Sequence, residues 1–509
     1  MVSRIACVGG GPGGLFFATL AKQVMPDVEV TVFERNRRED TFGFGVVFSD
    51  ATLAGIHAAD PVLLRGLHDH GRHWDRIEVR LKGERLRCGG NGMAAIHRKT
   101  LLSLLQGRAA EVGVELRFET EVAGLSELDE FDLVVAADGA NSRIRAELAD
   151  ALAPSAEVAT AKFIWFGTSY LFDGLTFVHE HGPHGTFAVH GYPVSDSIST
   201  FIVETDEASW RAAGLDEFDT SQPPGPSDEK TQRYLEKLFA EQIDGHPLLT
   251  NNSRWGNFRT RRARSWHHGN VVLLGDAAHT AHFSVGSGTK MAMEDAIALA
   301  DALAATPDDL ATALDTYEQV RRPQVAKIQD SARPSLSWWE HFGRYHDAFE
   351  PAQFAFHFLS RSIGRAKLAQ RDPEFVAIAE HAWRASHDGH DVLDTPLELD
   401  DLRLDGRFLT DDVPLGPRAM RLAAPDTEAG LPAVFAELDA LAWQRPSAVV
   451  VHSGTSLTRA LLSEQARLVH GIPTVLAEPD VGSGTVDRAA TLVLSGRADV
   501  VATSEAVGA

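Results

Sequence analysis

A glycine-rich turn between two apolar segments is the feature that most constrains the fold of this 509-residue chain. The β-rich run 5–8 precedes Gly9-Gly10-Gly11-Pro12-Gly13-Gly14, an apolar helical pattern follows, and the alternating run 28–33 ends at Glu34. Gly9, Gly11 and Gly14 fit the spacing G-x-G-x-x-G, and Glu34 lies 20 residues after the last of them. This order predicts a dinucleotide-binding unit, with backbone N–H groups on a pyrophosphate and Glu34 on ribose hydroxyls.

Two further buried-type strands also end in turns. The run 131–137 leads into Asp138-Gly139, and the run 270–274 leads into Gly275-Asp276. Farther along, Gly286-Ser287-Gly288 precedes a helix predicted over 289–304. Because parallel strands end at one edge of their sheet, we expect these turns to line a single ligand crevice together with the first.

Charge and cysteine content exclude several classes of protein. Lys and Arg number 48 against 71 Asp and Glu, and the net charge of -23 repels nucleic acid and anionic membranes, so neither is expected as a partner. Cys7 and Cys88 form no disulfide framework and are expected to be buried thiols in a reduced, cytoplasmic setting. No apolar stretch reaches the ~18 residues that a membrane helix needs.

Taken together, the glycine-bearing segments resemble the group A flavoprotein monooxygenases over roughly residues 2–390. The resemblance implies an α/β fold with a Rossmann-type FAD-binding domain, formed by residues 1–155 and 265–335. An antiparallel-sheet substrate domain is expected over 156–264, a helical region over 336–400 and a small α/β domain over 401–509.

The resemblance implies FAD as the cofactor, with NADH or NADPH as a transient electron donor. Arg98 matches an arginine near the FAD, and a solvated helix start is the less favoured interpretation. The D-G turn is associated with both FAD and nicotinamide. The complete set of expected cofactor contacts is Gly9, Gly11, Pro12, Gly13, Gly14, Glu34, Arg35, Arg98, Asp138, Gly139, Asp276, Gly286, Gly288 and Thr289.

The strings 275–295 and 42–50 are similar to one branch of the family, the aryl-CoA hydroxylases such as the salicylyl-CoA 5-hydroxylases and the monooxygenase half of the 2-aminobenzoyl-CoA monooxygenase/reductases. This implies that O₂ and a C4a-hydroperoxyflavin convert salicylyl-CoA to gentisyl-CoA. Phe283 and Lys290 depart from the Pro and Asn that the wider family commonly has at these places.

His282 is our candidate for the base that removes or accepts the phenolic proton, because imidazole titrates near neutral pH. A structural histidine bonded to the backbone explains this residue equally well. The substrate pocket near the flavin is expected to include Gly45, Val46, Val47 and Phe283.

The middle of the chain alternates apolar and polar residues over 163–172, 175–178, 186–189 and 198–203, which predicts antiparallel strands. The aromatic side chains of these strands either cover the substrate or belong to the hydrophobic core. For any single aromatic residue, the core is the favoured interpretation. Four histidines occur here, but no neighbouring cysteine or carboxylate cluster completes a metal site, so no metal is expected. They are His179, His181, His184 and His190.

Within the expected substrate domain, arginines are densest near its end. A CoA substrate carries phosphates that arginine recognises well, and a solvated strand edge is the competing interpretation. The arginines are Arg254, Arg259, Arg261, Arg262 and Arg264.

The sequence pattern over 448–502, near the C-terminus, predicts the order β-α-β-α-β. This segment resembles the last strands of a (β/α)₈ reductase barrel. It is too short for a whole barrel, and we interpret it as a small structural or dimerisation domain, which allows a homodimer.

Two other functions remain open from the sequence. One is hydroxylation of a free aromatic such as an indole or aminobenzoate derivative, and the other is a non-catalytic, flavin-bound scaffold. A flavin halogenase is disfavoured because its Trp-x-Trp-x-Ile-Pro segment does not occur, and a hydrolase because no Gly-x-Ser-x-Gly elbow occurs.

Overall fold

The structure is a computed structural model that describes residues 2–41, 43–220, 222, 225–282, 288–400, 402–411, 414–479, 482–504 and 506. It divides into two compact units. The first consists of Met1–Ile77 and Asn91–Glu340, and the second of Glu78–Gly90 and His341–Ala509.

A six-stranded sheet in the order β16-β17-β9-β1-β2-β8 forms the base of the first unit. β1 is parallel to its neighbours β2 and β9, and Val8 at its end pairs with both Phe33 and Ala136. β17 is parallel to β9, so the strands that precede the three predicted turns end at the same edge. The strands are β1 (Arg4–Val8), β2 (Glu29–Phe33), β8 (Glu115–Arg117), β9 (Leu133–Ala136), β16 (His267–His268) and β17 (Val271–Leu273).

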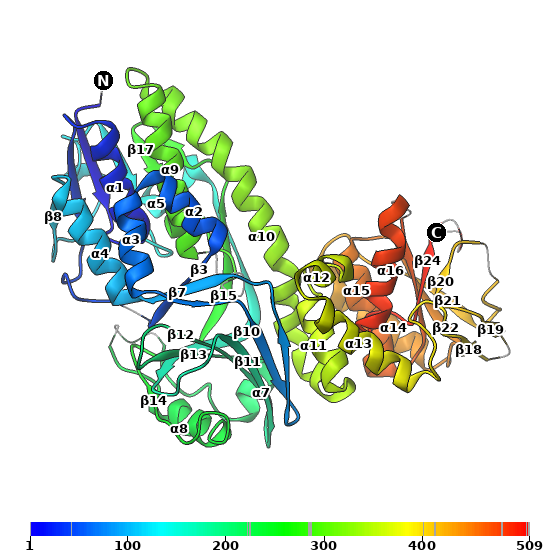
Figure 1. The fold of residues 1–509 in the computed structure, drawn as a ribbon. Coiled ribbons are helices and arrows are strands. Elements are labelled where there is room, and N and C mark those ends of the chain that lie inside the picture. The colour runs from blue at the N-terminus through cyan, green and yellow to red at the C-terminus, as the bar shows by residue number, and fades with distance from the viewer. Residues whose placement is uncertain are drawn as a thin grey trace. The chain divides into compact units, whose positions relative to one another are not determined.

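Helix α1 (Pro12–Val24) follows the glycine turn and packs against α4 (Arg98–Glu111) and α9 (Gly288–Ala305) (Figure 1). Its apolar residues are buried almost all round, as expected for a helix enclosed by a sheet and other helices. A small antiparallel sheet, β3-β7-β4, lies in the same unit. The accompanying elements are β3 (Gly45–Ser49), β4 (Arg72–Trp74), β7 (Met93–His97), α2 (Asp50–Ala59), α3 (Pro61–His70), α5 (Arg143–Glu147) and α6 (Ala149–Leu152).

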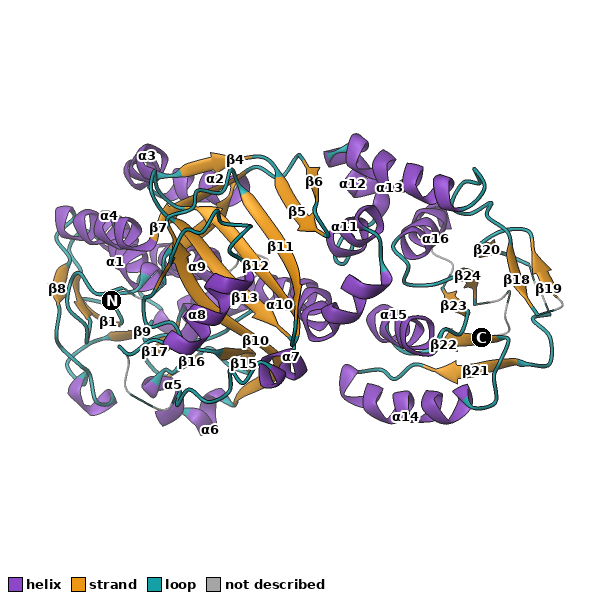
Figure 2. Ribbon diagram, turned by 90° about the horizontal axis from the view of Figure 1, so that it is seen from below, coloured by secondary structure: helices purple, strands orange, loops and turns teal. Residues whose placement is uncertain are grey.

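An antiparallel sheet runs in the order β14-β10-β13-β12-β11, and β15 also pairs with β10. Figure 2 shows β10 to β13 side by side. One face packs its aliphatic and aromatic residues, including Phe166 and Phe201, into a core with Leu235 of α8 and with Phe239. The elements are β10 (Pro154–Thr168), β11 (Leu175–Gly182), β12 (Gly185–Pro193), β13 (Ser199–Thr205), β14 (Leu248–Leu249), β15 (Gly256–Ala263), α7 (Glu207–Ala212) and α8 (Glu229–Leu238).

The second unit contains a five-stranded sheet, β20-β24-β23-β22-β21, in which every neighbouring pair is parallel. This confirms the predicted β-α-β-α-β pattern as β22, α15, β23, α16 and β24, and it adds a strand on each side. The strands and helices of the sheet are β20 (Phe408–Leu409), β21 (Ala419–Ala423), α14 (Leu431–Ala442), β22 (Ala448–His452), α15 (Ser456–Glu464), β23 (Thr474–Glu478), α16 (Thr485–Leu494) and β24 (Val500–Thr503).

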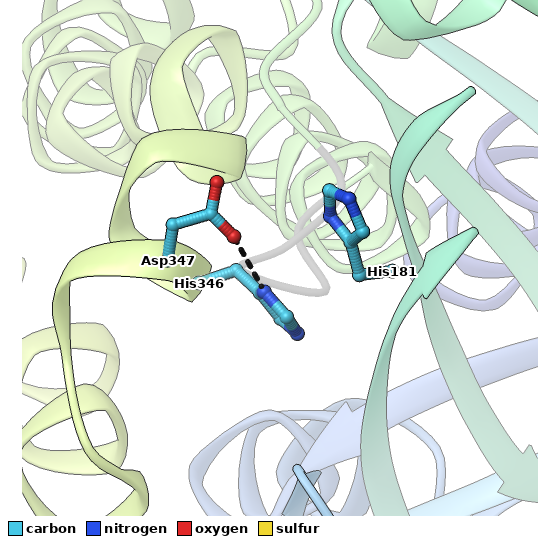
Figure 3. Close-up of side chains that lie close together, drawn as sticks. All are labelled: His181, His346 and Asp347. Atoms are coloured by element: carbon cyan, nitrogen blue, oxygen red, sulfur yellow. Dashed lines mark hydrogen bonds and ion pairs between the residues drawn. The ribbon is translucent and has the colours of Figure 1, made fainter. Parts of the chain in front are cut away.

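Further helices and short strands belong to the two units. α10 spans 39 residues without interruption at Pro323 or Pro334. In its last turn, His346 Nδ1 lies 3.1 Å from Asp347 Oδ1 (Figure 3). The elements are β5 (Ile77–Leu81), β6 (Glu84–Cys88), α10 (Leu310–Ala348), α11 (Pro351–Leu359), α12 (Arg365–Arg371), α13 (Pro373–Ser386), β18 (Leu397–Leu399) and β19 (Leu402–Leu404).

A buried carboxylate, Glu464 of α15, joins several parts of the second unit. Its oxygens accept from Arg344 Nη2 at 3.1 Å and from the hydroxyl of Tyr345, and Arg497 Nε lies 3.6 Å away. Burial first, and then Arg497, keep the pKa of the neighbouring His357 well below its usual value, so His357 is neutral. The two arginines therefore supply the positive charge that compensates Glu464.

Glu464→Gln is expected to lower the free energy of unfolding by about 3 kcal/mol, because it leaves Arg344 and Arg497 buried without their counter-charge. Urea denaturation measures the change. Glu437→Gln, at an exposed position of α14, is the matched control and should stay within about 0.5 kcal/mol of the wild type. Equal stability of the two variants would contradict this role of Glu464.

Candidate active site

A cavity of ≈ 460 Å³ lies in the first unit, with walls from the glycine turn, the two later turns, the start of α9, β3 and the antiparallel sheet. The three strand ends therefore meet at one site, as their order along the chain implies. The predicted site residues that line it are Gly11, Pro12, Gly13, Gly14, Gly45, Val46, Val47, Arg98, Gly139, Asp276, Gly288 and Thr289. Those that do not are Gly9, Glu34, Arg35, Asp138 and His282.

The glycine turn brings the backbone close to β9 and to the start of α1. A Cβ atom at Gly9, where φ is +113°, would lie 2.2 Å from the carbonyl oxygen of Ala137, and a Cβ at Gly14 would lie 2.2 Å from that of Gly9. A Cβ at Gly11 would meet nothing within 4 Å. Gly9 and Gly14 are thus required for packing, while Gly11 leaves open space over the N-terminus of α1.

The carboxylate of Glu34 is turned back toward the glycine turn. Its Oε2 accepts from the Gly10 backbone N–H at 2.8 Å, and its Oε1 accepts from the backbone and side chain of Asn36 at 2.8 and 2.7 Å. Oε2 has a further lone pair, so these bonds are compatible with a ribose contact at that oxygen. The neighbouring Arg35 is exposed.

The D-G turn is tied to the G-D turn by an arginine that the sequence analysis missed. Asp138 Oδ2 accepts from the backbone N–H of Arg143 at 2.8 Å and so caps the segment that follows. Arg145 is buried and donates at 2.7 Å to the carbonyls of both Ala140 and Ala277. Its position six residues after Gly139 gives no signal for this role without the fold.

Opposite charges face the cavity at the G-D turn. Asp276 faces the open space of the cavity. The surrounding protein shields its carboxyl from bulk water and so raises its pKa, while His279 and Arg98 act in the opposite direction. Burial lowers the pKa of Arg98, while Tyr192 and Asp276 raise it. Arg98 Nε is buried and has no hydrogen-bond partner among the described residues, so this arginine has capacity for a ligand.

Asp295 of α9 holds the G-D turn in place. Its Oδ2 accepts from the Gly275 backbone N–H at 3.1 Å and from His279 Nε2 at 2.7 Å, and its Oδ1 accepts from Arg321 Nε at 2.8 Å. Burial alone would raise the pKa of Asp295, but His279 and Arg321 hold it below its usual value. Asp295 is at the end of the string that carried the family resemblance, yet the sequence did not indicate its role.

The antiparallel sheet presents a polar and aromatic face to the cavity. Cross-strand pairing places Trp165 and His190 on either side of Ile202, and all three line the cavity. Tyr192 also lines it, and burial raises the pKa of Tyr192 to about 12, so its hydroxyl is protonated. Trp165 belongs to the runs whose aromatic side chains were expected either to cover the substrate or to form core, with core favoured, and the structure places it on the cavity wall.

His282 lies behind this wall. Its ring packs on Phe258, a lining residue, with the centroids 4.1 Å apart. Its Nε2 is 3.8 Å from Oε1 of Glu204, and both side chains are at most 1% exposed. Of the other predicted residues in this segment, Phe283 and Gly286 lie outside the described residues.

The four clustered histidines have separate surroundings. His179 lies against Trp338 and Trp339, while His190 lies against Phe177. His181, labelled in Figure 3, shares a hydrogen bond with Thr186 Oγ1 at 2.9 Å. His184 shares one with the Tyr234 hydroxyl at 3.2 Å.

The five arginines differ in their contacts, and Arg264 is exposed. Arg262 is paired with Asp330 at 3.2 Å and Glu157 at 3.6 Å, and Arg254 donates to loop carbonyls. Arg259 is exposed and lines the cavity. Arg261 donates to Asn141 Oδ1 at 3.2 Å, and its pKa is lowered by burial and by Arg259. Arg259 is therefore the member that is best placed to meet an anionic ligand.

Neither α10 nor any other described helix combines the length and the apolar character that crossing a bilayer requires.

Comparison with known proteins agrees with this geometry. The model of the FAD binding domain matches residues 3–332. Salicyloyl-CoA 5-hydroxylase of Streptomyces sp is 60% identical over 98% of this chain and 99% of its own length. 3-Hydroxy-4-methyl-anthranilyl-[aryl-carrier protein] 5-monooxygenase of Streptosporangium sibiricum is 40% identical over 66% of this chain and 89% of its own length.

Solved structures give the same fold. The tetrameric form of 2-methyl-3-hydroxypyridine-5-carboxylic acid oxygenase covers 71% of this chain and 98% of its own, with a TM-score of 0.55 and 18% identity. The expected cofactor FAD and the α/β fold are confirmed by these matches. The chain belongs to the FAD binding domain family, as a flavin-dependent monooxygenase.

Proposed function

We propose that this protein hydroxylates salicylyl-CoA at ring position 5, in the reaction salicylyl-CoA + NAD(P)H + H⁺ + O₂ → gentisyl-CoA + NAD(P)⁺ + H₂O. The proposal draws on the full-length similarity to a protein of that name. The observation that carries it is the single cavity whose wall contains both the glycine turn and the aromatic face of the antiparallel sheet.

The residues of the cavity fit FAD. Gly11 leaves room over the N-terminus of α1, where backbone N–H groups and the helix dipole favour a pyrophosphate. Arg98, with its buried and unpartnered Nε, is available to an anionic or carbonyl group of the cofactor. When bound, FAD supplies the redox chemistry by accepting electrons from the nicotinamide and activating O₂.

The antiparallel sheet has the task of orienting the aromatic ring and excluding water. Trp165, Ile202 and Phe258 give it an apolar wall against which a flat ring can pack. The 2-hydroxyl of the substrate activates its para carbon, position 5, while the thioester withdraws electron density. A group that takes the phenolic proton offsets that withdrawal, and we assign this role to His282.

The CoA arm and the assembly are further parts of the proposal. Arg259 is the lining arginine that we expect to contact a CoA phosphate.

We propose a cytoplasmic homodimer, and we retain the domain boundaries at 155, 264, 335 and 400. A solved structure of similar fold is described as tetrameric, so sedimentation of the holoenzyme decides the assembly.

Gly11→Ala is expected to weaken FAD binding by at least about tenfold while the apoprotein remains folded, because the added methyl group meets no protein atom within 4 Å but enters the pyrophosphate site. Fluorescence titration of the apoprotein with FAD measures the affinity. Gly107→Ala, where an added Cβ also meets nothing, is the matched control. Unchanged FAD affinity of Gly11→Ala would place the pyrophosphate elsewhere.

The wild-type protein with FAD, NADH and O₂ is expected to convert salicylyl-CoA into a product 16 Da heavier, a shift set by the one oxygen atom transferred. Mass spectrometry and comparison with authentic gentisyl-CoA identify it. Salicylate, an indole and an aminobenzoate are parallel substrates. Turnover of a free acid or indole but not of the thioester would support the free-aromatic alternative, and no turnover of any would support a scaffold.

His282→Asn should slow product formation by about 100-fold, the usual size of a general-base contribution, and leave the rate of flavin reduction by NADH within about twofold. Stopped-flow absorbance separates the two steps. His184→Asn changes an exposed histidine in the turn between β11 and β12 and serves as the control. Normal hydroxylation by His282→Asn would remove His282 from the mechanism.

A further inference from the structure

The ring of the proposed substrate has two carbons that its substituents activate alike. The 2-hydroxyl donates electron density to the free carbons ortho and para to it, positions 3 and 5, and both of these lie meta to the thioester. Electronic effects therefore do not select position 5. Turning the ring over about the axis through C1 and C4 exchanges the two carbons, so the protein has to distinguish these two orientations.

The thioester carbonyl differs in position between the two orientations. In the neutral substrate the 2-hydroxyl donates to this carbonyl within the molecule, which keeps the carbonyl oxygen in the ring plane on the side of position 3. The sulfur then lies on the side of position 5. When the ring is turned over, the oxygen and the sulfur exchange places, so one hydrogen-bond donor at a fixed place on the wall favours one orientation.

Tyr192 of β12 is a donor at a suitable place on the cavity wall. His190 lies opposite Ile202 across the strands, and Tyr192 is two residues farther along β12 on the same face. Tyr192 is therefore a diagonal neighbour of Ile202, about 7 to 8 Å away. Both residues line the cavity, and Ile202 belongs to the apolar wall for the ring. A carbonyl oxygen on that ring, extended by one hydrogen bond, spans a similar distance.

Neighbouring elements hold the ring of Tyr192. It stacks on Trp74 of β4, with the ring centroids 5.9 Å apart and the planes at 30°. A Cβ atom at Gly45 of β3 would lie 3.1 Å from Tyr192 Cε2, a ring carbon next to the one that bears the hydroxyl. The hydroxyl end therefore lies beside β3, where Gly45 also lines the cavity. A side chain held in this way loses little conformational freedom when it binds a ligand.

The hydroxyl of Tyr192 carries its proton at neutral pH. Burial raises its pKa to about 12, against the opposing effects of Thr200 and Arg98. A protonated phenol donates one hydrogen bond, which is what an uncharged thioester carbonyl accepts.

Two other neutral side chains of the cavity wall already use their donors within the protein. Asn257 Nδ2 donates to two backbone carbonyls of β10, at 2.9 and 3.3 Å. Thr280 Oγ1 donates to a backbone carbonyl of β15 at 2.6 Å. Tyr192 is therefore better placed than either of them to donate to the substrate.

We propose that Tyr192 is a specificity-determining residue, whose hydroxyl donates to the carbonyl of an ortho-hydroxylated aryl thioester and so directs oxygen transfer to position 5 rather than position 3. This inference rests on the proposed function, because it concerns the orientation of that substrate. Tyr192 takes no part in proton transfer. It selects the orientation of the bound ring before the oxygen atom is transferred.

Tyr192→Phe removes the hydroxyl and keeps the ring that stacks on Trp74. With salicylyl-CoA we expect the ratio of 2,3- to 2,5-dihydroxybenzoyl-CoA to rise about tenfold, because one hydrogen bond no longer favours the productive orientation. Flavin reduction by NADH at saturating substrate should stay within about twofold. Chromatography and mass spectrometry against both authentic thioesters measure the ratio. Tyr234→Phe, on α8 and bonded to His184, is the matched control and should keep the wild-type ratio.

A thioether analogue separates the carbonyl contact from an effect on the shape of the wall. In S-(2-hydroxybenzyl)-CoA a methylene group replaces the carbonyl. Tyr192→Phe should weaken the binding of salicylyl-CoA about tenfold and that of the thioether less than about twofold, because only the first ligand has the acceptor. Absorbance changes of the oxidised flavin in the holoenzyme measure these affinities without turnover.

Equal losses of affinity for the two ligands, or an unchanged product ratio in Tyr192→Phe, would overturn the proposal. If Tyr192→Phe does not fold, the wild-type holoenzyme tests the same contact. It should bind the thioether about tenfold more weakly than salicylyl-CoA, and equal affinity for the two ligands would reject the contact.

The outcomes distinguish this inference from the proposed function. Formation of gentisyl-CoA by the wild type, with an unchanged product ratio in Tyr192→Phe, leaves the function standing and rejects the role of Tyr192. No hydroxylated product from the wild-type holoenzyme rejects the function, and with it the selection of position 5.

Discussion

The buried carboxylate of Asp295 is the interaction on which the cofactor side of the cavity depends. It is bonded to Gly275 and His279 of the G-D turn and to Arg321 of α10, so one charge joins α9, α10 and the end of β17. An ionised carboxylate inside a protein is tolerated only when its lone pairs and its charge are both compensated, and here they are. The G-D turn, and Asp276 with it, is thereby held at a fixed place on the wall.

The substrate side is built on a different principle. An antiparallel sheet has two chemically distinct faces, and this one packs Phe166 and Phe201 into a core while Trp165 and Tyr192 face the cavity. The parallel sheet supplies turns with backbone donors, and the antiparallel sheet supplies flat apolar side chains with a few polar groups. A cavity between them offers both a phosphate-binding edge and an aromatic wall, which is the combination that a flavin and an aromatic substrate require.

The parts predicted correctly from the sequence are those with a local signature. Gly9, Gly14 and the strands around them could be placed because tight turns and close backbone approach demand glycine at set spacings. The cavity wall was harder, because alternation shows that Trp165 and His190 have a buried side but not which of the two faces is core. Arg145 and Asp295 were missed for a related reason: their partners are distant in sequence and come together only in the fold.

Two buried glutamates, Glu464 and Glu204, each lie near a histidine. Glu464 Oε1 is 3.8 Å from His357 Nε2, and Glu204 Oε1 is 3.8 Å from His282 Nε2. Glu464 is also contacted by Arg344, Arg497 and the Tyr345 hydroxyl, groups that stay charged or protonated at neutral pH, so its charge is compensated over the physiological range. A nearby imidazole therefore does not by itself mark a buried glutamate as a group that serves the reaction, because the same separation occurs at a carboxylate whose role is structural.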